Sequence, residues 1–182
     1  MLILASSSPR RKEILSKIRK DFIIFSPNID EKLIEPYLKA YNVSYDEARL
    51  KAYMVHSFYP DDEVLAADTL VICDGEILGK PKDRNDAISM LEKQSGKKLV
   101  VLTSYTYLSS KTEISRTVKS YVYFNELNRN QIEEYIDKFN PLDKAGAFGI
   151  QDDYPLIDHI EGSYDNIKGL PSEDLLKFVF RN

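Results

Sequence analysis

Hydrophobic and polar residues follow two different periods along this chain, and the periods predict strands and helices in turn. Short apolar runs bounded by turn residues predict strands at 2–5, 22–25, 64–73, 76–78, 99–108, 113–124 and 155–160. Apolar positions three and four apart predict helices after Ser8 and at 44–57, 83–96, 128–139 and 171–180. Turn signals at 74–75 and 109–111 predict two hairpins between the helical crossovers. The pattern therefore predicts an α/β fold with a mixed sheet.

The first eleven residues join an apolar run, three serines, Pro9 and two arginines. Ser8 can cap the helix, and Pro9 fits its first turn because the missing N–H costs nothing there. Free backbone N–H groups and serine hydroxyls at such a helix start favour an anion. Arg10 and Arg11 stand where the helix dipole favours acids, so the motif indicates a polyanionic ligand. Taken alone, it also fits a capped helix with two solvated arginines.

Asp68 is the best single candidate for a general base or metal ligand, because its strand is otherwise apolar. A carboxylate there is costly unless it is paired, hydrated or bound to a metal. Asp30 and Glu31 could supply a second oxygen ligand for a hard divalent ion. The alternative for Asp68 is an aspartate at a strand end that faces water or makes a hydrogen bond. The alternative for Asp30 and Glu31 is a solvated acidic loop.

Three further polar residues have positions that suit a nucleotide ligand. Lys51 and Lys80 are candidate phosphate ligands, and Gly79 and Pro81 restrain the backbone around Lys80. Gln151 follows a glycine-rich loop and could read a base edge with its amide. Each of them, taken alone, also fits an ordinary surface side chain.

The bulk composition narrows the possible classes of protein. The formal net charge is −4, from 25 Lys and Arg against 29 Asp and Glu. It argues against a nucleic-acid coat or a basic membrane-surface protein. The single cysteine, Cys73, excludes an internal disulfide and fits a reducing cytoplasm. No apolar stretch has membrane-spanning length and no charged region precedes the first apolar run, so we expect neither a membrane span nor a signal peptide. We expect a single domain over residues 1–182.

A set of short motifs, in matching order and spacing over nearly the whole chain, resembles the Maf family of nucleoside triphosphate pyrophosphatases, once described as septum-formation inhibitors. The motifs are Leu4–Arg11, Asp30–Glu31, Leu50–Ala52, Ala67–Thr69, Gly79–Pro81, Ser95–Gly96 with Thr103, Asp143–Gln151 and Gly169–Pro171.

The resemblance implies a mixed twisted sheet with flanking helices and two lobes around a cleft, similar to the inosine triphosphate pyrophosphatases. It implies hydrolysis of a nucleoside triphosphate to monophosphate and pyrophosphate with a divalent cation, Mg²⁺ or Mn²⁺. Asp68 matches the family's proton acceptor and, with Glu31, its metal ligands. The phosphate-binding positions are matched by Ser6, Arg11, Lys51 and Lys80. The family also implies a homodimer, and we expect neither a nucleic acid nor a membrane as a partner.

The same resemblance implies a preference among nucleotides, through three positions that differ between two branches of the family. The family branch that acts on dTTP and UTP has arginine, threonine and glutamine where this chain has Arg10, Thr69 and Gln151. The branch that acts on 7-methyl-GTP typically has tryptophan, glutamine and glutamate there. All three positions favour dTTP and UTP, or modified pyrimidine nucleotides. The chain departs from the usual family pattern at Glu47, Leu99 and Ser104, where leucine, histidine and glycine are common.

The alternative function comes from another class, a regulator of cell division that binds nucleotides or nucleic acid without turnover. The acids Glu31 and Asp68 count against it, because a pure binder has little use for carboxylates beside phosphates.

Overall fold

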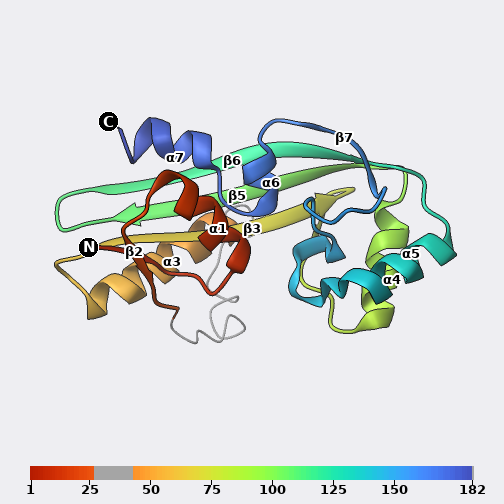
Figure 1. The fold of residues 1–182 in the computed structure, drawn as a ribbon, viewed down its shortest axis with the longest axis horizontal. Coiled ribbons are helices and arrows are strands. Elements are labelled where there is room, and N and C mark those ends of the chain that lie inside the picture. Colours follow the sequence, from red (N-terminus) through yellow and green to blue (C-terminus); the bar gives the residue numbers. More distant parts are fainter. Residues whose placement is uncertain (27–42, 182) are drawn as a thin grey trace. The chain divides into compact units, whose positions relative to one another are not determined.

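A computed structural model describes residues 1–26 and 43–181, and it confirms the predicted mixed α/β class (Figure 1). The strands within this part of the chain are β1 (Leu2–Leu4), β2 (Phe22–Ile24), β3 (Glu63–Cys73), β4 (Glu76–Leu78), β5 (Lys98–Leu108), β6 (Glu113–Phe124) and β7 (Ile157–Glu161). The helices are α1 (Pro9–Ile18), α3 (Val43–Phe58), α4 (Arg84–Gln94), α5 (Arg129–Phe139), α6 (Tyr164–Lys168) and α7 (Ser172–Phe178), with short 3₁₀ turns at Pro141–Asp143 and Ala145–Ala147. None of these helices is long and apolar enough to cross a membrane.

The described strands form one mixed sheet in the order β2-β1-β3-β5-β6-β7, with β4 paired to β3. Strand β1 runs parallel to both β2 and β3, whereas β4 and β7 run antiparallel to their partners. Parallel strands need crossover helices and antiparallel ones can be joined by hairpins, which accounts for the mixture of both in the sequence pattern.

The chain divides into two compact units, and strands β3, β5 and β6 contribute to both. The first unit comprises residues 1–68, 103–118 and 169–182, and the second comprises 69–102 and 119–168. The predicted single domain and the predicted cleft stay predictions.

In the first unit, alternate residues of β1 and β3 are buried on opposite faces of the sheet. Leu2, Leu4, Leu65 and Ala67 pack with residues of α1 and α7. Ile3, Val64 and Ala66 pack with Ala52 and Val55 of α3. Because side chains alternate along a strand, Asp68 continues the face of Ala66, and so it faces α3.

The same unit holds a partly exposed ion pair beside the first of these clusters, to which Tyr105 belongs. Asp174 of α7 accepts hydrogen bonds from Arg116 Nε at 2.7 Å and from the hydroxyl of Tyr105 at 2.8 Å. Tyr105 is fully buried, so this carboxylate satisfies a hydroxyl that water does not reach. The contact joins α7 to strands β5 and β6.

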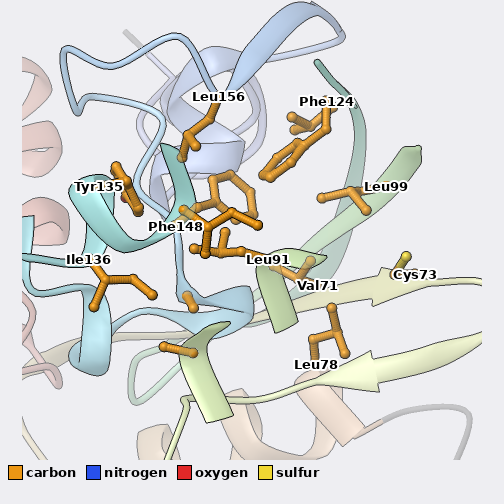
Figure 2. Close-up of a cluster of buried hydrophobic side chains, with 14 of the residues drawn as sticks. Val71, Cys73, Leu78, Leu91, Leu99, Phe124, Tyr135, Ile136, Phe148 and Leu156 are labelled. Atoms are coloured by element: carbon orange, nitrogen blue, oxygen red, sulfur yellow. The ribbon is translucent and has the colours of Figure 1, made fainter. Parts of the chain in front are cut away.

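The second unit has an apolar cluster of its own between α4, α5 and the sheet (Figure 2). Leu91 of α4 and Tyr135 of α5 are fully buried in it, together with Leu99 of β5. Phe148, from the glycine-rich loop, packs edge-on against Phe124 at a ring-centroid distance of 5.0 Å. The loop is therefore part of the core of this unit.

Local sequence signals set most of the element ends. Ser8 accepts the N–H of Arg11, Asp83 accepts that of Asp86, and Asn128 forms a capping box with Gln131. Asp74 and Gly75 both have positive φ, +50° and +79°, as the predicted hairpin turn requires.

Two expectations about the elements were wrong, and one helix was not predicted. The strand at 22–25 is not buried, since Ile23 and Ile24 are 40% and 43% exposed in a strand that begins the sheet order. Ser44 lies inside α3 rather than capping it, and its hydroxyl pairs with Ser104 at 2.7 Å. Helix α6 had no predicted counterpart.

Candidate functional site

The anion motif at the N-terminus is built in the first unit by the end of β1 and the start of α1. Ser6 is buried, and its hydroxyl accepts the backbone N–H of Ser8 at 3.2 Å and Arg11 Nη1 at 3.4 Å. Arg11 Nε donates to the carbonyl of Gly169 at 2.8 Å. One long-range contact and one local contact thus orient the guanidinium toward the serine turn. Arg10 lies half-buried in the same helical turn. The arrangement can bind an anion through N–H groups and a fixed cation.

A second polar group forms where α3 packs on β3. Lys51 Nζ lies 3.6 Å from Asp68 Oδ1 and 3.6 Å from Glu47 Oε2. All three side chains are between 10% and 15% exposed, so the ammonium stands between two nearly buried carboxylates. Asp68 Oδ2 is buried and has no hydrogen-bond partner among the described residues. A buried carboxylate oxygen of this kind can accept a proton or bind a cation.

The pairing of β1 with β3 relates these two groups within the first unit. Leu4 is opposite Leu65 in the parallel register, and Ala5 N donates to Leu65 O at 2.8 Å. Ser6 and Asp68 therefore both follow the carboxyl end of this pairing, where β1 stops and β3 continues. Open α/β sheets bind ligands beyond the carboxyl ends of their strands.

The predicted metal ligands are Asp68 and Glu31. The buried, unpartnered Oδ2 of Asp68 is a hard oxygen donor, which suits Mg²⁺ or Mn²⁺. Glu31 lies outside the described residues, as does Asp30. Within residues 1–26 and 43–181, no three His, Cys, Asp or Glu side chains cluster as a complete metal site. The described residues fit one carboxylate ligand, and the second ligand stays a prediction.

The remaining candidates, Thr69, Lys80 and Gln151, belong to the second unit. Thr69 follows Asp68 directly in β3 and is half-buried, whereas Lys80 is exposed after β4. The carbonyl of Gly79 accepts the N–H of Gly146 at 3.0 Å, so the Lys80 segment is bonded to the glycine-rich loop that leads to Gln151. Convergence of these three residues with Arg11 and Asp68 stays a prediction.

Gln151 stands in a tight turn whose ends are held by a phenol. The N–H of Asp152 donates to the carbonyl of Gly149 at 3.1 Å, and Gly149 N donates to the hydroxyl of Tyr135 at 3.0 Å. That hydroxyl in turn donates to Asp152 Oδ2 at 2.5 Å. Burial, together with the hydrogen bond to Asp152, raises the pKa of Tyr135, so the phenol keeps its proton at neutral pH. Gln151 Oε1 is buried without a hydrogen-bond partner among the described residues.

Sequence reasoning missed three of these contributors. Glu47 was noted only as a departure from a family pattern, although its spacing of four from Lys51 is a known ion-pair signal. The Gly169 carbonyl and Tyr135 carry no local signal, because their partners Arg11 and Asp152 are 158 and 17 positions away.

Comparisons of this chain with known proteins found a matching family model, relatives of similar length and a partly matching solved structure. The model of the Maf-like protein family matches residues 1–181. A dTTP/UTP pyrophosphatase of Pyrococcus abyssi is 41% identical over 100% of this chain and 97% of its own length. One from Thermosipho africanus is 44% identical over 93% of this chain and 87% of its own length. The solved structure of the Staphylococcus aureus Ham1 protein has a TM-score of 0.45 and 14% identity, over 68% of this chain and 70% of that chain.

Proposed function

Because the chain belongs to the Maf-like protein family, we propose that it hydrolyses dTTP and UTP to the nucleoside monophosphate and pyrophosphate. The full-length relatives named dTTP/UTP pyrophosphatase support this activity. The observation that carries it is the Asp68 carboxylate, held against Lys51 by one oxygen and buried without a partner at the other. A site for phosphate alone has little use for such an acid.

In the proposed reaction, a water oxygen attacks the α-phosphorus and pyrophosphate leaves with the bridging oxygen. Asp68 Oδ2 accepts the proton that the water loses, or orients that water. Lys51 neutralises charge on the phosphate oxygens, as does Arg11, whose guanidinium is aimed by Gly169 and Ser6. Lys80 and Arg10 add further positive charge to the triphosphate.

A divalent cation is part of the proposal. Asp68, together with Glu31, would hold it, and it would neutralise phosphate charge and lower the cost of forming the nucleophile. The orphaned oxygen of Asp68 supports one of the two ligands.

We assign selectivity for the base to Gln151. Thr69, which directly follows Asp68 in β3, is a second substrate-binding candidate. Uracil and thymine present an imide N–H between two carbonyl oxygens, and the amide oxygen of Gln151 is an acceptor that needs such a donor. Cytosine has a ring nitrogen acceptor in place of that N–H. Modified pyrimidines that keep the imide fit the same description.

Release of pyrophosphate from a panel of nucleotides tests the function. The panel holds dTTP, UTP, dCTP, CTP, dATP, GTP and 7-methyl-GTP, each with Mg²⁺, with Mn²⁺ and with a chelator. We expect turnover of dTTP and UTP that the chelator abolishes. A protein that binds these nucleotides but releases no pyrophosphate with either metal would instead be the non-catalytic regulator.

Two substitutions connect the activity to the site. Asp68→Asn should lower kcat by at least about a hundredfold with an unchanged far-UV spectrum, because it removes the proton acceptor. Asp61→Asn, at an exposed carboxylate just before β3, is the matched control and should be silent. Gln151→Glu should change the order of preference among the bases. Near wild-type turnover in Asp68→Asn, or an unaltered base preference in Gln151→Glu, would remove that residue from its role.

A further inference from the structure

The turn that carries Gln151 has both ends tied to one buried hydroxyl. Gly149 and Asp152 close the turn through the Asp152 N–H, and Gln151 lies between them. Tyr135 accepts from the N–H of Gly149 and donates to the carboxylate of Asp152. A single phenol therefore bridges the two residues that determine where the Gln151 backbone lies.

The phenol is itself a rigid anchor. Tyr135 is fully buried in the apolar cluster of the second unit (Figure 2). Its ring centroid lies 5.1 Å from that of Phe139 and 5.6 Å from that of Tyr154. A ring enclosed in this way cannot swing out without opening the core. Its hydroxyl therefore holds the turn at a defined place relative to α5.

Asp152 is charged and nearly buried, and it has a second partner. Its side chain is 10% exposed, and Lys144 Nζ, on a side chain 11% exposed, lies 3.7 Å from its Oδ2. A carboxylate is tolerated at such a position when a cation and a hydrogen-bond donor compensate it. Lys144 supplies the cation and Tyr135 supplies the donor.

The packing around Gly149 places the amide of Gln151 beside this carboxylate. A Cβ atom built on Gly149 would lie 2.8 Å from Gln151 Nε2 and also 2.8 Å from Asp152 Oδ2. The negative charge on this side favours the N–H end of the Gln151 amide over its oxygen end. The amide oxygen, Oε1, is the atom left buried without a hydrogen-bond partner among the described residues.

From this geometry we propose that Asp152 and Tyr135 are positioning residues that orient the Gln151 amide and so set the selectivity for an imide-bearing pyrimidine over cytosine. The inference rests on the proposed function, in which Gln151 reads the base. Without the carboxylate, the amide can rotate by half a turn and offer an N–H donor to the ring nitrogen of cytosine. Without the phenol, the whole turn loses its anchor. The chemistry itself, assigned to Asp68 and Lys51, does not pass through these residues.

Two isosteric substitutions and two matched controls test the proposal in the full chain. Asp152→Asn removes only the charge, and Asp153→Asn repeats the change at the exposed neighbouring acid. Tyr135→Phe removes only the hydroxyl. Tyr154→Phe is its control, because Tyr154 belongs to the same ring cluster but its hydroxyl donates to Glu134 at the surface, at 3.1 Å.

The measurement is kcat/KM for UTP divided by kcat/KM for CTP, together with the ratio of dissociation constants for the α,β-methylene analogues of both nucleotides. We expect Asp152→Asn and Tyr135→Phe to lower both ratios about tenfold, mainly through KM, with kcat for UTP within about threefold of wild type. Both controls should keep the wild-type ratios. A merely structural role would lower kcat for both nucleotides and leave the ratios unchanged.

The outcomes separate this inference from the proposed function. If the wild-type protein binds the UTP analogue selectively and Asp152→Asn abolishes that selectivity, the inference is supported. This holds even if the wild-type protein releases no pyrophosphate, and in that case only the proposed activity fails. Ratios within twofold of wild type in Asp152→Asn overturn the inference while the activity stands. Equal loss of selectivity in Asp153→Asn also overturns it. If Tyr135→Phe does not fold, Asp152→Asn decides alone, and a wild type that binds neither analogue overturns both ideas.

Discussion

Removing the ammonium of Lys51 should destabilise the protein far more than removing an ordinary helical lysine. In Lys51→Met, the carboxylates of Glu47 and Asp68 lose a cation that lies 3.6 Å from each. Since both were bound to one nitrogen, they end up at most about 7 Å apart, where two like charges repel by about 2 kcal/mol at an effective dielectric constant near 20.

The burial of the three side chains sets the size of the effect. Removing one partner of a buried ion pair costs about 3–5 kcal/mol, and exposures of 10% to 15% place this cluster at the lower end. We expect Lys51→Met to lower the free energy of unfolding by about 3 kcal/mol. Glu47→Gln should cost only about 1 kcal/mol, because Lys51 keeps Asp68 as a partner.

Urea unfolding at pH 7, followed by circular dichroism because the chain has no tryptophan, measures these differences. Lys17→Met is the control, since Lys17 and Glu13 have the same spacing of four on α1 but are 60% and 53% exposed. The control should cost less than about 0.5 kcal/mol. Glu47→Gln added to Lys51→Met should recover about 1–2 kcal/mol by removing the repulsion. Equal losses in Lys51→Met and Lys17→Met, or a double variant less stable than Lys51→Met, would refute this reasoning.

Three further predictions concern residues outside the candidate site. Asp174→Ala should lower the free energy of unfolding by about 2–3 kcal/mol in urea, because it leaves the buried hydroxyl of Tyr105 without its acceptor; an unchanged midpoint contradicts this. Gly162→Ala should lower the melting temperature, because Gly162 has φ of +100° and an added Cβ would lie 2.7 Å from Ser120 Oγ; calorimetry that shows no shift would rule out strain there. Burial raises the pKa of Tyr107 to about 12, so the folded protein retains a proton that an unfolded chain releases near pH 10. Stability should therefore be complete below about pH 10 and fall as the pH rises toward 12, and Tyr107→Phe should flatten this decline in a series of urea titrations.

Most of the secondary structure could be predicted from the sequence because its signals act over a few residues. A capping side chain such as Asp83 or Asn128 bonds to a backbone N–H three positions away. The positive φ angles of Asp74 and Gly75 belong to a two-residue turn. These interactions hold wherever the segment ends up in the fold, so the sequence pattern is sufficient.

Burial was harder to predict, because it depends on which elements become neighbours. The apolar residues Phe22–Phe25 read as a buried strand, yet Ile23 and Ile24 are exposed where β2 begins the sheet order. Ser44 has the side-chain chemistry of an N-cap, but α3 starts one residue earlier. The Ser44 hydroxyl is hydrogen-bonded to that of Ser104 instead. In both cases the tertiary surroundings decided what the local pattern left open.

For the candidate site, the amino-acid types along the chain pointed to Arg11, Lys51, Asp68 and Gln151 as candidates for nucleotide chemistry, and the family resemblance added Ser6. Their partners could not be identified in the same way. Arg11 is oriented by a carbonyl 158 positions away, and Lys51 becomes a bridge only because α3 packs on the face of β3 that carries Asp68. The amino-acid sequence alone determines which chemical groups are present. The free energy of a charged group or an amide in the folded protein depends on the groups that surround it in space, and only the tertiary structure determines these.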